Sequence, residues 1–205
     1  MALTDYSNFV TVAGNYLGRT DLNTTQMPDF ITMAQYRMTR DLRVTEMLKV
    51  VTTDTSSGDG KVALPNDFLE TKEVHIQGNP PITLEYQSPD LFFRNKQSTT
   101  SGKPYYFTIV DQEIQLAPKS DSTRTVEMLY YAKPDFISAS TSSNIYLANF
   151  PDALLYATLT EAETYLMNDN RVTTWSALYD RAIANIMKND RSKQYPNTTL
   201  NVTTR

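Results

Sequence analysis

The sequence predicts an α+β protein: an antiparallel helical bundle from the N- and C-terminal thirds, an inserted small antiparallel β-barrel or sandwich, and an extended C-terminal arm. Apolar residues recur with helical spacing in the first and last thirds, whereas the middle consists of short β-branched and aromatic runs between turn residues. The polar end has neither pattern. We therefore expect 1–48 plus 145–188 to form the bundle, 49–144 the inserted β domain and 189–205 the arm.

Two helices are expected before residue 48. Thr4 and Asp5 can cap the first, and Gly18 can end it. Pro28 suits the first turn of the second, where a missing N–H costs nothing. The second helix carries an apolar stripe with spacings of i, i+3, i+7 and i+11, formed by Ile31, Ala34, Met38 and Leu42. This stripe predicts a buried face.

The middle of the chain changes to the composition of strands. The runs expected to be extended are 47–55, 61–65, 72–77, 82–87, 105–110, 113–118 and 125–134. Asp111 and Gln112 are expected to form a two-residue hairpin connection. The stretch 67–70, "DFLE", is expected to be a turn. One short helix is expected after Ser88, with Pro89 in its first position.

Two more helices are expected after residue 148. Asn149 and Pro151 open the first, and the break at 168–170 precedes the second, with Asn170 as its cap. The two apolar stripes are Leu155, Leu159, Ala162 and Leu166, then Trp175, Leu178, Ala182 and Ile186. So short a break predicts an antiparallel pair. Neither stripe can be buried by the other alone, so we expect both to pack with the N-terminal helices.

Few residues suggest catalysis. The only histidine, His75, is expected to face solvent on a strand, and cysteine is absent, which excludes thiolate metal sites. Phosphate-cradling glycine motifs are also absent. Glu161 and Glu163 are two residues apart on a helix and point in different directions. The sequence therefore predicts no catalytic residue, no metal site and no cofactor.

Net charge and hydropathy limit the classes of partner that the protein is expected to have. The net charge is −4, so no global field attracts nucleic acid or an acidic membrane. The N-terminus lacks the pattern of a signal peptide, and no apolar run is long enough to span a membrane. We expect a soluble protein that the general secretory route does not export. The thirteen tyrosines and eight phenylalanines favour core and interface packing over a stacking platform for ligands.

The polar end carries a small set of groups that could engage a partner. Its cations are Arg191, Lys193 and Arg205, and its sizeable apolar side chains are Tyr195, Leu200 and Val202. The β-branched stretch "TTLNV" could add a strand to the edge of a partner's sheet. One interpretation is an arm that becomes ordered on a partner, and the other is an end that is disordered in isolation.

Several sequence blocks, taken in order, resemble a known family. They are "MPDFITMAQYRMTRDLR", "LPNDFLETKEVHI", "LEYQSPD", "GKPYYFTIVDQEIQLAP", "VEMLYYAKP" and "FPDALLYATLTEAETYLMNDNRVTTWSALYDRAI". Together, over roughly 28–185, they resemble the head-to-tail adaptor (neck, tail accessory) proteins of tailed bacteriophages, especially of short-tailed phages. The "LPNDFLE" block and the spacing of Trp175 and Tyr179 are its most specific parts.

The resemblance implies a structural virion protein of the head–tail junction, made in the host cytoplasm. Such proteins form a ring, usually a dodecamer, below the portal protein. The ring continues the channel through which genomic DNA passes without specific binding, and it provides a docking platform for a tail nozzle, tail tube or fibre protein. The C-terminal arm, with the six residues named above, would then bind the portal or a neighbouring protomer.

Two alternatives remain open on the sequence alone. One is a cell-wall glycan hydrolase that uses two carboxylates. The other is a different virion tail module, such as a tail-tube or receptor-binding protein.

Overall fold

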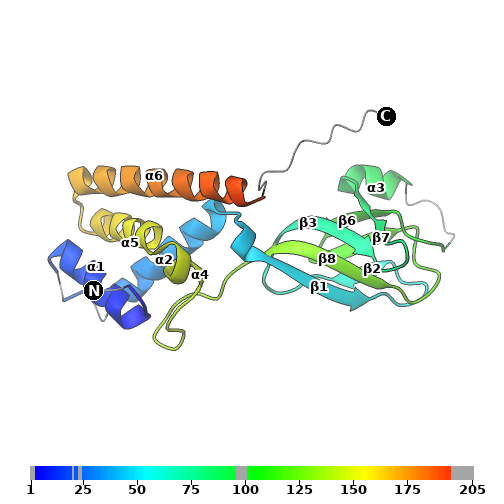
Figure 1. Ribbon diagram of the computed structural model, residues 1–205, viewed down its shortest axis with the longest axis horizontal. Coiled ribbons are helices and arrows are strands. Elements are labelled where there is room, and N and C mark those ends of the chain that lie inside the picture. The colour runs from blue at the N-terminus through cyan, green and yellow to red at the C-terminus, as the bar shows by residue number, and fades with distance from the viewer. Residues whose placement is uncertain (1–2, 20, 23–24, 96–100, 195–205) are drawn as a thin grey trace. The chain divides into compact units, whose positions relative to one another are not determined.

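The computed structural model describes residues 3–19, 21–22, 25–95 and 101–194 (Figure 1). The chain contains both helices and sheets, which confirms the predicted α+β class. It divides into two compact units. The helical unit combines Met1–Met47 with Pro134–Arg205, and the β unit is Leu48–Lys133. No helix among the described residues has the length and apolar character needed to cross a membrane.

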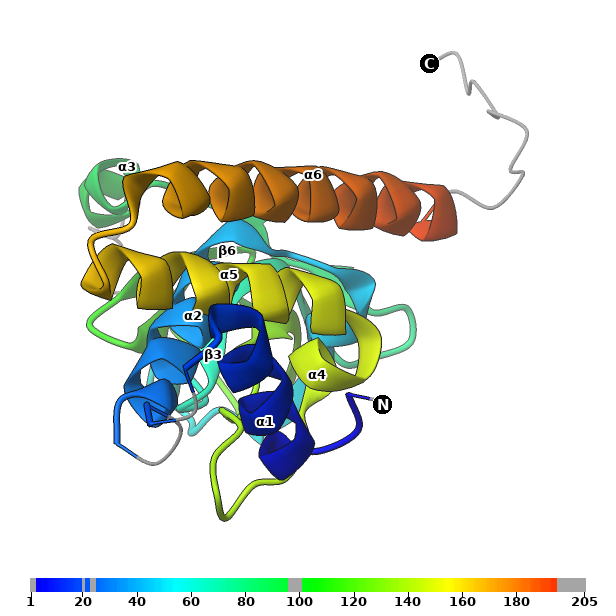
Figure 2. The same cartoon turned by 90° about the vertical axis from the view of Figure 1, so that its left-hand side faces the viewer.

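The helical unit is arranged around α5 (Pro151–Tyr165). This helix contacts α1 (Tyr6–Leu17), α2 (Met27–Asp41), α4 (Ile145–Asn149) and α6 (Asp169–Gln194) (Figure 2). Most of its side chains are buried, as expected for a helix with neighbours on several sides. A single turn of 3-10 helix, η1 (Thr45–Met47), ends the N-terminal part of this unit.

The N-terminal helices form as the sequence predicts. Asp5 caps α1 by accepting a hydrogen bond from the N–H of Asn8, and Gly18 ends it with φ +66°, a conformation that favours glycine. Pro28 lies in the first turn of α2. The predicted stripe of α2, formed by Ile31, Ala34, Met38 and Leu42, is completely buried.

The C-terminal helices begin differently from the prediction. Asn144, not Asn149, is a cap: its side chain accepts a hydrogen bond from Leu147 N–H and starts the short helix α4. Asn149 lies at the end of α4, and α5 starts at Pro151. Asn170 lies inside α6 rather than capping it. The prediction placed a helix boundary at each Asn because Asn favours caps. An Asn caps a helix only where its own backbone is non-helical, as at Asn144, whereas Asn149 and Asn170 lie within helices.

Helix α6 is longer than the sequence predicts and runs to Gln194. Residues 189–194, which were expected to begin the extended arm, are helical. The prediction was wrong here because the segment has no apolar stripe. Its inward contact is made by Asp190, a charged residue that is only 5% exposed.

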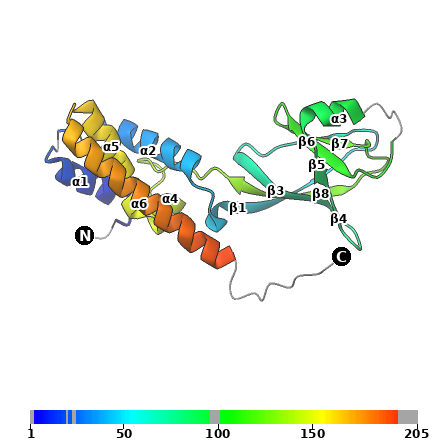
Figure 3. The same ribbon diagram turned by 90° about the horizontal axis from the view of Figure 1, so that it is seen from above.

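The described residues of the β unit form two four-stranded sheets (Figure 3). The first has the order β1-β8-β3-β4, with β1 (Leu48–Asp54), β8 (Thr125–Ala132), β3 (Phe68–Ile76) and β4 (Ile82–Thr83). The second has the order β2-β7-β6-β5, with β2 (Lys61–Ala63), β7 (Glu113–Ala117), β6 (Tyr106–Val110) and β5 (Glu85–Tyr86). The sheets are separate, so the unit is not a closed barrel. Neighbouring strands are antiparallel except for the parallel pair β5–β6.

Two stretches of the β unit depart from the prediction. Residues 68–70, expected in a turn, begin β3 and pair with Tyr131 and Ala132 of β8. The run 82–87, expected as one strand, is divided into β4 and β5, which belong to different sheets. The buried Leu84 lies between them. The hairpin at Asp111 and Gln112 is confirmed, with both residues at positive φ between β6 and β7. The short helix α3 (Pro89–Asn95) is also confirmed.

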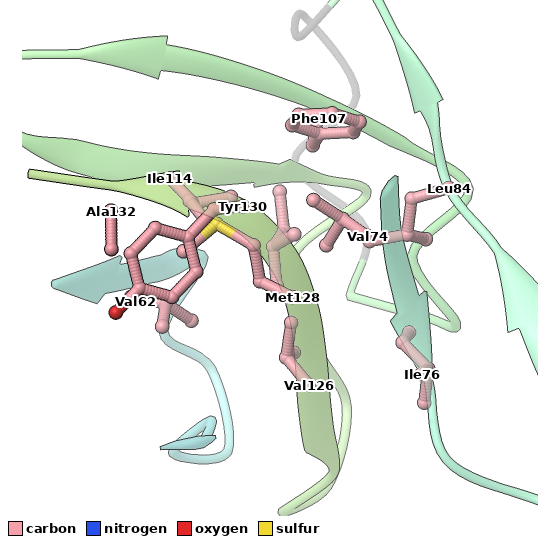
Figure 4. Close-up of a cluster of buried hydrophobic side chains, with 11 residues drawn as sticks. Val62, Val74, Ile76, Leu84, Phe107, Ile114, Val126, Met128, Tyr130 and Ala132 are labelled. Atoms are coloured by element: carbon pink, nitrogen blue, oxygen red, sulfur yellow. The ribbon is translucent and has the colours of Figure 1, made fainter. Parts of the chain in front are cut away.

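The core of the β unit lies on the inner faces of the two sheets (Figure 4). Strand β8 shows the alternation most clearly, because Val126, Met128, Tyr130 and Ala132 are all buried while the residues between them are partly exposed. The full cluster is Val62, Val74, Ile76, Leu84, Phe107, Ile114, Leu116, Val126, Met128, Tyr130 and Ala132.

Candidate functional site

The candidate site is the C-terminal end of α6, from which the predicted arm departs. Here Asp190 binds the start of η1: its Oδ1 accepts a hydrogen bond from the backbone N–H of Thr45 at 2.8 Å. Its Oδ2 accepts one from Nε2 of Gln194 at 2.6 Å. Two segments far apart in the sequence are therefore joined by one buried carboxylate, which fixes the end of α6.

The environment of Asp190 keeps it ionised. Burial alone would raise the pKa of this carboxyl group, but the hydrogen bonds from Thr45 and Gln194 and the charge of Lys193 stabilise the anion and lower the pKa overall. A carboxylate that accepts several hydrogen bonds gains stability in its charged form. This group therefore anchors the helix and is poorly suited to act as a general acid.

A second contact lies beside the first. Nζ of Lys193 forms an ion pair and hydrogen bond with Oε1 of Glu46, which belongs to η1. This hydrogen bond, together with the negative charge of Glu46, raises the pKa of Lys193. The ammonium group is largely exposed, so the pair adds little to stability on its own. Its effect is to orient the last turn of α6 toward η1.

A groove runs along this end of the helical unit, with a volume of about 500 Å³. It lies among η1, the junction of α4 and α5, and the second half of α6. Its lining is mixed polar and apolar and includes three acidic side chains. The lining residues are Val44, Glu46, Ala148, Asn149, Phe150, Asp152, Ala182, Asn185, Ile186, Asn189, Asp190 and Lys193.

The predicted arm residues fall into two groups. Arg191 and Lys193 lie on the last turns of α6, where both are exposed and Lys193 is paired with Glu46. Tyr195, Leu200, Val202 and Arg205 lie outside the described residues, so their assignment to an arm stays a prediction. Sequence analysis missed Asp190 and its partner Thr45. Within "KNDRSKQ" nothing distinguishes Asp190 from a solvated charge.

The Trp175 and Tyr179 pair, singled out by the resemblance, fastens α6 to its neighbours. The indole of Trp175 stacks on Tyr156 of α5 at 6.1 Å and meets the edge of Tyr16 of α1 at 6.0 Å. The buried Tyr179 donates a hydrogen bond to Asp41 of α2 at 2.7 Å. One turn of α6 therefore contacts three other helices, which explains the spacing structurally.

A polar network surrounds Tyr179. The guanidinium of Arg37 lies over its aromatic ring at 4.4 Å and 3.9 Å from Glu161. Burial and the neighbouring carboxylate of Asp41 raise the pKa of the Tyr179 hydroxyl. The hydroxyl therefore stays protonated and keeps donating its hydrogen bond. Glu161 thus belongs to a structural network linking α2, α5 and α6.

Glu163 belongs to a separate network. It is 1% exposed, and its Oε1 lies 2.9 Å from Nε of Arg171 on α6. Arg171 also donates a hydrogen bond to the carbonyl of Tyr16. The two glutamates of α5 therefore have different partners, as their spacing predicts.

The remaining candidates for chemistry also have structural partners. His75 is partly buried, with Nε2 3.5 Å from Glu127 on the neighbouring strand, so it does not simply face solvent as predicted. Asp67 accepts hydrogen bonds from Lys49 and Tyr130. Burial alone would raise the pKa of Asp67, but these hydrogen bonds outweigh that effect and lower the pKa overall. Among the described residues, no group of three or more acidic or histidine side chains is placed to hold a metal ion.

Fold and site together define a two-unit α+β protein whose clustered polar groups fasten helices to one another. A comparison with protein families gives a more specific assignment: residues 4–203 match the model of the SU10 adaptor protein family. The chain therefore belongs to this family of bacteriophage head-to-tail adaptors, and the resemblance seen in the sequence is confirmed. A comparison with curated proteins finds no match.

Proposed function

We propose that this adaptor forms a ring, of twelve copies, below the portal protein of a tailed phage and provides the platform on which tail components dock. The observation that carries the proposal is the match to the adaptor family over residues 4–203, which spans both units and most of the predicted arm. The partners on the tail side are a nozzle, tail-tube or fibre protein.

The ring would continue the DNA channel. The net charge of −4 supports this part of the proposal, because a channel rich in cations would bind phosphates and retard the genome. Acidic side chains repel the backbone of the duplex and let it slide. DNA is then a passing cargo and not a specifically bound ligand.

The arm would bind the portal or a neighbouring protomer, starting after Gln194. Asp190 and Lys193 support this because they hold the end of α6 in one place, so that the chain that follows leaves from a fixed point. A fixed departure point reduces the conformational entropy lost on docking. Tyr195, Leu200, Val202 and Arg205 are the side chains proposed to make the contacts.

The proposal is tested in assembled particles. A phage lacking the protein should package DNA but produce heads that are tailless or leak their genome, and purified virions should contain the protein in a fixed ratio to portal. Absence of the protein from mature virions would overturn the proposal. Labelling that places it at the distal tip would support a receptor-binding or tail-tube module instead.

The carboxyl groups in the described part of the chain do not favour the alternative of a glycan hydrolase. Such an enzyme needs a carboxylic acid whose pKa is raised so that it can protonate the leaving group. The shifted carboxyl groups among the described residues are Asp21, Asp67, Asp121 and Asp190, and each pKa is lowered. A turbidity assay on purified peptidoglycan is the direct test, and we expect no clearing.

A further inference from the structure

One face of the helical unit exposes large apolar side chains around a shallow hollow. Met33 and Tyr36 of α2 are 55% and 48% exposed, and with Arg40 and Glu161 they line a hollow of about 290 Å³. Exposed apolar side chains gathered around a hollow are typical of interaction sites. Methionine, tyrosine and arginine are also residue types enriched at protein interfaces. We call these four residues the α2 hollow.

The α2 hollow is preorganised but electrostatically incomplete. The aromatic ring of Tyr36 is held edge-on against Phe136 at 4.7 Å, so it is already fixed in position. Among the described residues, the ion pair recorded for Glu161 is a long one, 3.9 Å from Arg37. Among the residues that the structure describes, Arg40 takes part in no ion pair. A partner that offers one acidic and one basic side chain could form ion pairs with Arg40 and Glu161, respectively.

The outer face of α6 offers this combination. Ala177, Asp180, Arg181 and Ala184 are all exposed, and their spacing of i, i+3, i+4 and i+7 puts them on one side of the helix. This side lies opposite the one that carries the buried Tyr179 and Ala182. Within the described part of the chain, neither Asp180 nor Arg181 is paired with an opposite charge. We call these four residues the α6 face.

We propose that the α2 hollow binds the α6 face of a second copy of this chain, with Asp180 of one copy near Arg40 of the other. Arg181 then lies near Glu161, and the small side chains of Ala177 and Ala184 let Met33 and Tyr36 pack closely against the helix. Short side chains at a helix contact allow a small interaxial distance. The occupant is a second copy because the two surfaces of one chain complement each other in charge and in side-chain size.

The proposed contact is heterologous, which is the kind of contact that can form a ring. The α2 hollow and the α6 face belong to different helices, both of which pack on α5, so one surface of each copy binds the other surface of the next. Such a heterologous contact continues from copy to copy and closes into a ring when the rotation allows. The inference rests on the proposed function and specifies which surfaces meet in the ring.

Charge reversal tests the pairing. In the full-length protein, Arg40→Asp alone and Asp180→Arg alone should each weaken self-association at least about tenfold, because each places like charges opposite each other. The double variant should restore association to within about threefold of the wild type. Mass photometry or sedimentation over a concentration series measures it. Arg94→Asp, at an exposed position of α3 in the β unit, is the matched control and should have no effect.

Cross-linking tests the contact directly, since the natural chain has no cysteine. A chain carrying both Met33→Cys and Ala177→Cys should give a ladder of multimers on mild oxidation. Either single variant should remain monomeric on a denaturing gel. Efficient dimerisation of a single variant would indicate a symmetric contact and overturn the proposal. Thermal melting of every variant confirms that it is folded.

The outcomes separate this inference from the proposed function. If the wild type forms a ring on portal that the two reversals leave unchanged, the inference is wrong and the adaptor ring stands. If the wild type forms no ring either alone or with portal, both are wrong. Rescue by the double reversal, together with the ladder, supports the pairing of these two surfaces.

Discussion

Asp190 and Thr45 are joined by a hydrogen bond of 2.8 Å between the side chain of one and the backbone N–H of the other. Thr45 opens η1, which leads directly into β1, while Asp190 lies one turn before the end of α6. The buried carboxylate therefore fixes the end of α6 to the segment through which the chain enters the β unit. Three of the following predictions test this relationship.

Replacing the carboxylate should destabilise the helical unit. We expect Asp190→Ala to lower the free energy of unfolding by about 1–2 kcal/mol, because it leaves the N–H of Thr45 without its acceptor. Asp190→Asn retains an oxygen acceptor and should lose less. Urea unfolding followed by circular dichroism measures both. Arg191→Ala, at the exposed neighbouring position, is the control, and an equal loss in that variant would show that Asp190 has no special role.

The stabilisation from Asp190 should depend on pH in one direction. The folded pKa is lowered below its ordinary value near 3.8, so this stability is fully present above that pH and is lost as pH falls through the folded pKa. The difference in unfolding free energy between wild type and Asp190→Asn should therefore be constant from pH 7 to 5. It should shrink below pH 4. A difference that instead grows on acidification would contradict the assignment.

Two truncations should behave differently. A chain that ends at Gln194 keeps the contacts of Asp190 and Lys193, so it should melt like the full-length protein while losing attachment to portal. A chain that ends at Lys188 lacks both contacts and should melt at a lower temperature. Differential scanning calorimetry and co-sedimentation with portal measure the two properties. Normal attachment of the chain ending at Gln194 would rule out the arm as the docking element.

The hydroxyl of Tyr179 should contribute to the stability of the helical unit through its hydrogen bond to Asp41. Tyr179→Phe removes the hydrogen bond to Asp41 and should lower the free energy of unfolding by about 1–2 kcal/mol. Tyr156→Phe is the matched control, since that aromatic ring stacks on Trp175 and its packing is kept. Denaturant unfolding measures the free energy of unfolding of both variants. Equal losses in the two would mean that the hydroxyl of Tyr179 is dispensable.

Periodicity predicted the elements that have one buried face. The stripe of α2 and the alternation along β8 follow from burial on one side, and both can be seen in the sequence. The hairpin at Asp111 and Gln112 was predictable because only these two residues separate the strand-like runs 105–110 and 113–118.

The end of α6 could not be predicted in this way. Its inward contact is a charged side chain whose acceptor role depends on Thr45, a residue 145 positions away. Apolar periodicity carries no signal for such a contact. The division of 82–87 between two sheets was likewise hidden, because the buried Leu84 suits the interior of a single strand as well as the step between two.

The central proposal is that copies of this head-to-tail adaptor form a ring beneath the portal. Electron cryo-microscopy of the full-length protein mixed with portal protein tests it most directly. We predict a ring of twelve copies beneath the portal, with the chain after Gln194 in contact with the portal or a neighbouring copy. A portal that remains bare at saturating concentrations of the protein would contradict the claim.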